Sequence, residues 1–448
     1  MLRPIDFSLL PVVLQLSLAT SVLGNEAAPG EPPQSIRLES LSADDVLAIA
    51  GRLIDVGRHD EAQALLDRLA ADRAGGVERD FLDAMIALAR KDYKRAEALF
   101  RKILADDPSL VRVRLELART LFLQQDDEDA DYHFKLAIAA HPPEAVIANI
   151  ARFREAIRAR RAWRFNLTLG IAPDSNINSA TAKEQVDVFG LPFELDPESR
   201  ARSGIGAIVA ADANVRIRRN TALPIYLGAY GRLARYDDHR FNDIYVGGEA
   251  GPEFRLEGGR LRVAATGLQR WYGGRQLVSS LGGKLNYDRI IGGKWALEVS
   301  LATRHNAYAR RSDVDGWDLE AALSANRALS TSALAFAYAS VERSIFNDHG
   351  QTSWQSRIGG GVLKEIAWGL RPQISLEVGR QVNDGPLAPF GRTRRDWRLQ
   401  ASASIYKQDW NVSGFAPSLR FSYSRSFSTI ALYDQKRQRA ELGIAKAF

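Results

Sequence analysis

The chain has 448 residues, with 60 Lys and Arg against 54 Asp and Glu, which gives a net charge of +6. It contains no cysteine, which excludes disulfide bonds, thiolate metal sites and lipidation of an N-terminal cysteine. Residues 25–160 carry 20 basic and 25 acidic side chains, whereas residues 161–448 carry 39 and 28. No nucleic-acid motif accompanies the basic part, so no nucleic-acid partner is expected.

The first segment, residues 1–24, is predicted to be a secretory signal peptide. Arg3 precedes an apolar run that ends at Leu23, and cleavage is expected before Asn25. The alternative is a single membrane anchor, but the run is shorter than the ~20 clean apolar residues that a spanning helix needs. Residues 25–40 are predicted to be a flexible linker.

Residues 41–161 are predicted to form a domain of helical repeats, each 34 residues long. Apolar residues recur about every 3.6 positions, and alanine returns at one point of each unit, at Ala62, Ala96 and Ala130. A helix–turn–helix unit of this length, with a small residue early in its second helix, resembles the tetratricopeptide repeat. Leu66 and its counterparts one and two units later are also apolar.

Two further positions of the repeat concern its turns and its ends. The glycine expected after the first helix is present once, as Gly57, but Lys91 and Gln125 occupy the same position of the next two units. Pro108 and Pro142 lie where a second helix should end, because proline cannot continue a helix. The turns therefore depart from the tetratricopeptide consensus in two of the three units.

Arrays of this kind usually present a groove that binds a peptide or a partner protein. We therefore expect the repeats to bind a client protein. The alternative is that these helices only brace the mouth of the following domain. A basic final helix over about 145–160 either contacts lipid phosphates or is a solvated face.

Residues 162–448 are predicted to form a transmembrane antiparallel β-barrel of about 14 strands, so the fold class is α+β multidomain. Period-two polarity, as in Leu399 and Ala401 against Gln400 and Ser402, gives one apolar and one polar face. The alternative is a soluble β-domain, but the second face is polar or small where a soluble barrel needs large apolar fillers. Tryptophans near strand ends would form interfacial girdles, and arginines would line the lumen and the strand ends.

The predicted strands are 163–173, 203–218, 223–235, 243–256, 260–272, 278–290, 293–305, 314–328, 331–343, 353–367, 369–382, 394–406, 415–427 and 437–448. An even number is typical of single-chain bacterial barrels. Tight turns such as Arg219-Asn220 and Gly292-Gly293 alternate with longer polar connections. If the tight turns are periplasmic, both termini and the helical domain are periplasmic as well. The longest connection, Asn178–Arg202, would be external or fold into the lumen.

The chain stops on Phe448. An aromatic C-terminus resembles the recognition signal of bacterial outer-membrane barrels, so the barrel-assembly machinery is an expected partner of the last strand. Outer-membrane lipid is the other expected neighbour of the barrel.

One string is more specific than its surroundings, and it consists of Pro173, Asp174, Ser175, Asn176, Ile177 and Asn178. A tetratricopeptide module, this string at the first strand, and about fourteen strands, in that order, resemble the surface lipoprotein assembly modulator (Slam) family. The resemblance implies a periplasmic helical domain on an outer-membrane barrel that moves a client protein, lipidated or soluble, to the cell surface.

The same string also has a mechanical interpretation. Its polar side chains compete with ladder hydrogen bonds, and Pro173 cannot donate to the ladder. The first strand is expected to end or bend there beside the last strand, which would weaken the closing seam and make it a candidate lateral gate. The alternatives are an ordinary polar turn and a Ca²⁺ site on Asp174 and Asn176, for which further oxygen ligands are missing.

No residue set points to catalysis. The six histidines are scattered without metal-ligand spacing, and no G-x-S-x-G string is present. An outer-wall lipase would need a serine partner for His305, and none stands out. We therefore expect no enzyme activity, cofactor or metal.

The function predicted from the sequence is an outer-membrane translocon for a client protein. The alternatives are a porin-like diffusion channel with an accessory periplasmic domain, and a scaffold that anchors periplasmic partners. A porin passes small ions without any client, whereas a plugged or gated translocon should not.

Overall fold

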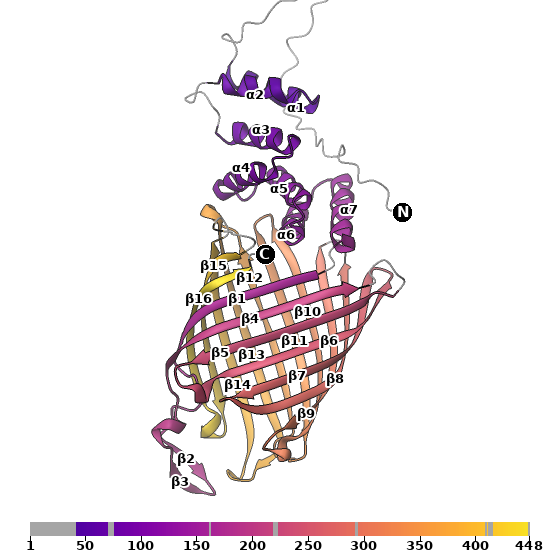
Figure 1. Ribbon diagram of the computed structural model, residues 1–448. Coiled ribbons are helices and arrows are strands. Elements are labelled where there is room, and N and C mark those ends of the chain that lie inside the picture. Colours follow the sequence, from indigo (N-terminus) through magenta and orange to yellow (C-terminus); the bar gives the residue numbers. More distant parts are fainter. Residues whose placement is uncertain are drawn as a thin grey trace, which may run out of the picture. The chain divides into compact units, whose positions relative to one another are not determined.

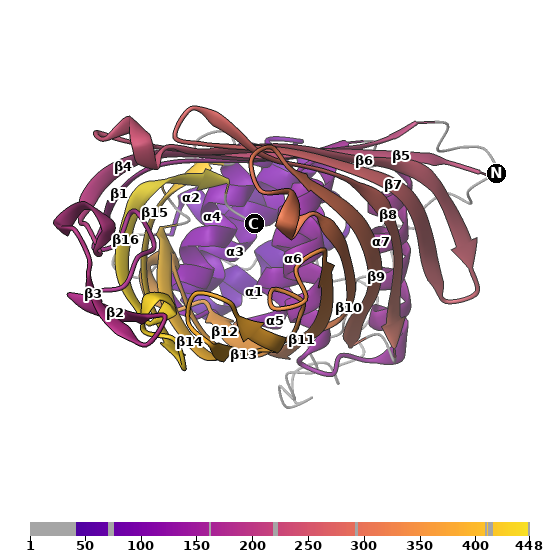
Figure 2. The ribbon, with the colours of Figure 1, turned by 90° about the horizontal axis from the view of Figure 1, so that it is seen from below.

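The computed structural model describes residues 42–69, 76–160, 163–217, 223–291, 294–407, 410 and 415–446. Several predictions lie outside these residues, namely the signal peptide and linker, the turns at Arg219-Asn220 and Gly292-Gly293, and Phe448. The described chain has a helical part and a β-barrel, drawn in Figures 1 and 2. Within this part of the chain, each helix is too short or too polar to cross a bilayer.

Seven α-helices precede the first barrel strand within the described residues. They are α1 (Ala43–Asp55), α2 (His59–Asp67), α3 (Gly76–Ala89), α4 (Tyr93–Asp106), α5 (Val111–Leu123), α6 (Asp127–Ile138) and α7 (Glu144–Arg160). The first six form three pairs in the predicted 34-residue register, and α4 and α6 end before Pro108 and Pro142, as expected. The prediction of tetratricopeptide-type repeats is confirmed.

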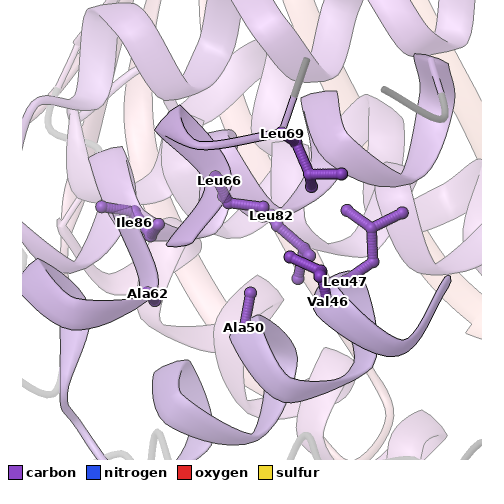
Figure 3. Close-up of a cluster of buried hydrophobic side chains, with 8 residues drawn as sticks. All are labelled: Val46, Leu47, Ala50, Ala62, Leu66, Leu69, Leu82 and Ile86. Carbon is purple, nitrogen blue, oxygen red and sulfur yellow. The ribbon is translucent and has the colours of Figure 1, made fainter. Parts of the chain in front are cut away.

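The repeat alanines lie in the second helix of each pair. Ala62, Ala96 and Ala130 are each 0 % exposed, because at these points the paired helices approach closely. In the first repeat, Ala62 lies in an apolar cluster that α3 completes (Figure 3), whose members are Val46, Leu47, Ala50, Ala62, Leu66, Leu69, Leu82 and Ile86. Each unit therefore buries its apolar face on its neighbour, which is why several units are needed for a stable core.

The turns inside the three pairs share one conformation although their residues differ. Gly57, Lys91 and Gln125 all adopt a left-handed backbone, with φ of 81°, 64° and 68°. In each turn this residue's N–H and the next one donate to carbonyls at the end of the first helix, in a Schellman arrangement. Glycine adopts this conformation without strain, whereas the lysine and the glutamine do so at a cost.

Fourteen antiparallel strands form a closed barrel in which β1 pairs with both β4 and β16. They are β1 (Trp163–Asp174), β4 (Gly204–Ile217), β5 (Ile225–Tyr236), β6 (Asp243–Leu256), β7 (Gly259–Tyr272), β8 (Arg275–Ile291), β9 (Trp295–Tyr308), β10 (Gly316–Ser330), β11 (Ala333–Phe346), β12 (Ser353–Lys364), β13 (Leu370–Leu387), β14 (Arg392–Lys407), β15 (Phe415–Ser428) and β16 (Gln435–Lys446). The predicted barrel of fourteen strands is confirmed. Figure 2 shows the strands arranged in a ring.

The two faces of the strands differ as the alternation predicts. Large apolar side chains on the outer face are exposed, such as Ile374 and Leu376 at 63 % and 64 %. The inner face carries charged and small side chains, and ion pairs such as Arg304–Asp318 join neighbouring strands across it. The basic charge of this part is therefore partly matched by acidic partners inside the barrel.

The barrel has two rims. We call the rim at Trp163 and Lys446 the terminal rim, and the opposite rim, with most of the longer connections, the loop rim. The eight tryptophans divide evenly between the rims. Trp163, Trp295, Trp368 and Trp410 are near the terminal rim, and Trp271, Trp317, Trp354 and Trp397 are towards the loop rim. Two aromatic girdles therefore mark the two interfaces of a membrane.

The longest connection contains a hairpin that the sequence did not predict. Strands β2 (Gln185–Val188) and β3 (Leu191–Glu194) pair with each other at the loop rim (Figure 1). The N–H of Phe189 donates to the carbonyl of Pro389 at 2.7 Å, in the connection between β13 and β14. This connection is also shorter than predicted, because β13 continues to Leu387 and β14 begins at Arg392.

Candidate functional site

Over the residues that the structure describes, the closing seam between β1 and β16 has fewer register pairs than the other junctions of the barrel. Five residue pairs are in register, from Thr168 with Ala445 to Asp174 with Arg439, whereas each other junction has ten or more. Pro173 lies in the gap of this register and cannot donate a ladder hydrogen bond. Within the described residues, 163–167 pair with β4 but have no register partner on β16.

Asp174 fastens the loop-rim end of the seam. Its carboxylate accepts from Arg437 of β16, with Nε to both oxygens at 2.9 Å and Nη2 to Oδ2 at 2.5 Å. The Asp174 side chain is 0 % exposed and that of Arg437 is 30 % exposed. Asp174 also accepts from the Asn176 N–H at 2.9 Å, and the Tyr236 hydroxyl lies 3.5 Å away. Bidentate pairing to arginine in a protected site is strong and directional.

Ser175 and Asn176 extend the fastening to the backbone of β16. The Ser175 N–H donates to the Gln438 carbonyl at 2.9 Å, and the Gln438 N–H donates to Ser175 Oγ at 2.8 Å. The fully buried Asn176 amide donates to the carbonyls of Lys436 and Ala180 at 3.1 Å and 2.8 Å. Its carbonyl oxygen accepts from the Ala180 N–H, so the amide joins the turn to the last strand.

Ile177 and Asn178 attach the same turn to the start of β4. Ile177 packs in a small apolar cluster with Ala172, Ile208, Ala234 and Tyr236. A Cβ on Gly204 would lie 3.1 Å from the Ile177 side chain, so a larger residue there would push this side chain aside by a few tenths of an ångström. The Asn178 side chain accepts from the Arg202 N–H at 3.0 Å and donates to the Arg200 carbonyl at 2.7 Å. Pro173 and Asp174 thus end β1 at the loop rim, and the other four residues of the motif form the turn that follows.

We name the set Asp174, Ser175, Asn176 and Arg437 the seam clasp. The first strand ends at Asp174, as the sequence predicts, but the hydrogen bonds across the seam continue beyond it. Within the described residues, the register with β16 is interrupted at Ala172 and Pro173, the second of which belongs to the motif. This seam has few ladder hydrogen bonds and is held at its loop-rim end by the side chains of the seam clasp. Such an arrangement is compatible with lateral opening of the wall, and a lateral gate stays a prediction.

The Ca²⁺ alternative receives no support from the contacts. The carboxylate of Asp174 is occupied by the Arg437 guanidinium, which supplies the positive charge that a cation would bring. Among the described residues, no group of three or more acidic or histidine side chains could hold a metal ion.

Arg437 is the member of the site that the sequence did not single out. It lies 263 residues from Asp174, so only barrel closure brings the two together. A signal was available, because the predicted last strand carries Arg437 and Arg439 on its polar face at the end that meets the motif. Tyr236, whose ring leaves no room for a Cβ on Gly206, was also missed.

A second polar cluster lies beside the clasp at the loop rim. Arg240 donates to Asp238 and, at 2.8 Å, to Glu198 of the long connection. Hydrogen bonds from Arg240 lower the pKa of Asp238 to about 2, so the carboxylate stays charged. Arg202, two residues before β4, lies 3.5 Å from the same carboxylate. The long connection is therefore tied to the neighbouring loop.

The helical part holds a buried charge cluster between its second and third repeats. Arg101 donates to Glu97 at 2.8 Å and to Asp129 at 2.7 Å. Burial, and then the nearby Asp129 carboxylate, raise the pKa of Asp126 to about 6. The Asp126 carboxylate also accepts a hydrogen bond from the Asp129 N–H at the start of α6. The side chain with the raised pKa is therefore also the one that caps this helix.

A closed fourteen-stranded barrel with a polar interior, two aromatic girdles and an N-terminal domain of tetratricopeptide-type repeats defines the class of repeat-bearing outer-membrane β-barrels. Residues 163–448 match the family model described as surface lipoprotein assembly modifier. Residues 77–134 match the model of the N-terminal TPR repeats of the same family. The chain therefore belongs to the surface lipoprotein assembly modifier family. It resides in the outer membrane, with the terminal rim and the helical domain on the periplasmic side.

Three curated relatives are similar over much of the chain. The surface lipoprotein assembly modifier of Moraxella catarrhalis is 24% identical over 384 residues, which cover 80% of this chain and 70% of the relative. Surface lipoprotein assembly modifier 1 of Neisseria meningitidis serogroup B is 23% identical over 400 residues, 86% and 77% of the two chains. The hemophilin secretion modulator of Acinetobacter baumannii is 22% identical over 257 residues, 53% and 51% of the two chains.

Proposed function

We propose that this protein is an outer-membrane translocon that delivers a client protein from the periplasm to the cell surface. The observation that carries the proposal is the family match over the whole barrel together with the repeats. The relatives named for lipoprotein assembly and for hemophilin secretion support a lipidated or a soluble secreted client. The helical repeats would receive the client, and the barrel would pass it outward.

In this proposal the seam between β1 and β16 is the point at which the wall opens. Among the described residues it has five register pairs, fewer than each of the other junctions, so less strand pairing holds it together. The seam clasp would then set the energy of opening at the external end, because its buried ion pair must separate. No chemical reaction is required, and we propose that the protein acts without catalytic residues, the free energy coming from client binding and folding outside.

Two further partners belong to the proposal. The barrel-assembly machinery would recognise the C-terminal strand, for which the aromatic end of the chain is the motivating feature. Outer-membrane lipid would surround the barrel between the two girdles, where large apolar side chains such as Leu442 and Ile358 are 65 % exposed.

A reversible cross-link tests the seam. Because the chain has no cysteine, the pair Ile171→Cys and Leu442→Cys introduces the only thiols, at residues that are in register across the seam. With a candidate client from a neighbouring gene, we expect oxidation to lower surface display at least tenfold and a reductant to restore it. The matched control, Ala325→Cys with Ala337→Cys between β10 and β11, should display normally when oxidised.

Two outcomes would contradict the proposal. Full display through the oxidised seam would exclude lateral opening and leave the lumen as the route. Steady ion conductance of the purified protein in planar bilayers without a client would favour a diffusion channel instead.

A further inference from the structure

The outer wall of the barrel carries a shallow depression. This depression of about 570 Å³ lies over β6, β7, β8 and β9, which are side by side in Figure 1. Its floor lacks side chains at Gly248 and Gly267, which are in register across β6 and β7. Leu281 and Val246 line it and are 72 % and 54 % exposed, so the depression opens towards lipid.

Three polar side chains line the loop-rim end of this depression, namely Gln269, Ser279 and His305. Gln269 is in register with Val246, and His305 is in register with Leu281, so they share the outer face. Strand residues that face lipid are normally apolar, and near the interface a polar side chain on this face can bond the polar linkages of a lipid. A polar cluster on this face therefore points to a polar partner in the membrane.

The hydrogen bonds within this cluster leave the donors of Gln269 and His305 available to a ligand. Ser279 Oγ donates to Gln269 Oε1 at 2.6 Å, and it accepts from Gln276 Nε2 at 3.0 Å. In the described part of the chain, neither the imidazole of His305 nor the amide nitrogen of Gln269 has a hydrogen-bond partner. The imidazole contacts the Trp317 ring edge-on, with centroids 5.1 Å apart.

The depth of the cluster matches the linkages of a lipid. Trp317 belongs to the loop-rim girdle, so His305 lies at the level of the external interface. Gln269 and His305 are each three residues from the loop-rim ends of β7 and β9, which is about 10 Å along a strand. At the level of an aromatic girdle the head-group region meets the acyl chains, so the ester or amide linkages of a lipid are within reach of this cluster.

We propose that this depression binds one acyl chain of a lipid in the external leaflet. The chain would lie over the floor at Gly248 and Gly267, and its linkage carbonyl would accept hydrogen bonds from Gln269 and His305. The outer face of the wall is what the membrane covers, so the occupant is a membrane lipid. The site shares no residue with the seam clasp and does not depend on the proposed translocation.

The test uses the full-length protein in detergent and native mass spectrometry, with saturated diacyl phosphatidylglycerol as the probe. The wild type should retain one lipid per barrel. It should prefer the ester lipid over its dialkyl ether analogue about fivefold, the ratio expected for one hydrogen bond. Gly267→Leu should reduce retention at least tenfold, and the barrel tolerates it because a Cβ there meets only the Ser280 carbonyl, at 3.9 Å.

Two further variants distinguish the effect of filling the depression from the effect of removing its hydrogen-bond donors. Ala403→Leu places the same leucine side chain on the exposed outer face of β14, and it should retain the lipid. The double variant Gln269→Leu with His305→Leu should still bind the probe but should lose the preference for the ester. A merely structural role of these side chains would not change that ratio.

Equal retention by Gly267→Leu and Ala403→Leu would overturn the proposal, and so would equal binding of ester and ether lipids by the wild type. If a triacylated lipopeptide binds and phosphatidylglycerol does not, the occupant is the lipid of a client and the membrane-lipid assignment is wrong.

Discussion

Replacing Asp174 by alanine should loosen the seam at its external end. The variant removes the acceptor of the Arg437 guanidinium and of the Asn176 N–H. Breaking a buried ion pair by removing one partner costs about 3–5 kcal/mol. Because the Arg437 side chain is 30 % exposed and can regain water, we expect a local cost of about 2–3 kcal/mol.

Hydrogen exchange measures this cost at the residues concerned. An opening free energy lowered by about 2–3 kcal/mol speeds exchange about 30- to 150-fold where opening limits it. Peptides that cover residues 168–176 and 435–446 should show this acceleration in detergent-solubilised protein. Peptides from β10 and β11 should exchange as in the wild type.

Asp318→Ala is the matched control. Asp318 is 7 % exposed, lies 3.0 Å from Arg304 and accepts from Asn306 and Ser344 inside the wall. Its loss should speed exchange in β9 to β11 and leave the seam protected. The reasoning is refuted if Asp174→Ala leaves seam exchange unchanged, or if Asp318→Ala loosens the seam equally.

Three predictions concern the helical part, and all are measured by thermal melts of the helical circular dichroism signal. Lys91→Gly and Gln125→Gly should each stabilise it by about 0.5–1 kcal/mol, because glycine relieves the left-handed backbone; destabilisation would contradict this. Ala96→Leu should destabilise it by about 1–3 kcal/mol, because the alanine is 0 % exposed between paired helices, and an unchanged melt would argue against close packing. The raised pKa of Asp126, about 6, means that the folded form holds the proton more tightly than the unfolded chain, so stability falls as pH rises through 6. Asp126→Asn should therefore add about 1–3 kcal/mol at pH 7.5 and reduce the dependence between about pH 4 and 6, the interval between the unfolded and folded pKa values, whereas an unaltered pH profile would exclude this role.

The sequence predicted the elements that repeat. Fourteen strands followed from period-two polarity, and the helix pairs followed from alanines 34 residues apart, because both signals extend over many residues. The β2–β3 hairpin was missed because four-residue strands are too short for that pattern. Its turn, moreover, holds Phe189 at a φ of 51°, where Asn or Gly is usual.

The candidate site was only half predictable. The motif residues stand out as a polar string after an alternating strand, but their partners depend on register. Asp174 meets Arg437 only once the first and last strands pair, and the sequence alone does not fix that register. The motif combines two features: Pro173 lies where the register with β16 is interrupted, and the residues after it form a clasp that the sequence did not predict.

Deleting residues 25–160 tests the translocation account most directly. The truncated barrel is compared with the full chain in cells that express the client, and protease accessibility reports the client at the surface. The account predicts that the barrel still inserts in the outer membrane and that the client is no longer displayed. Unchanged display by the inserted barrel would contradict it.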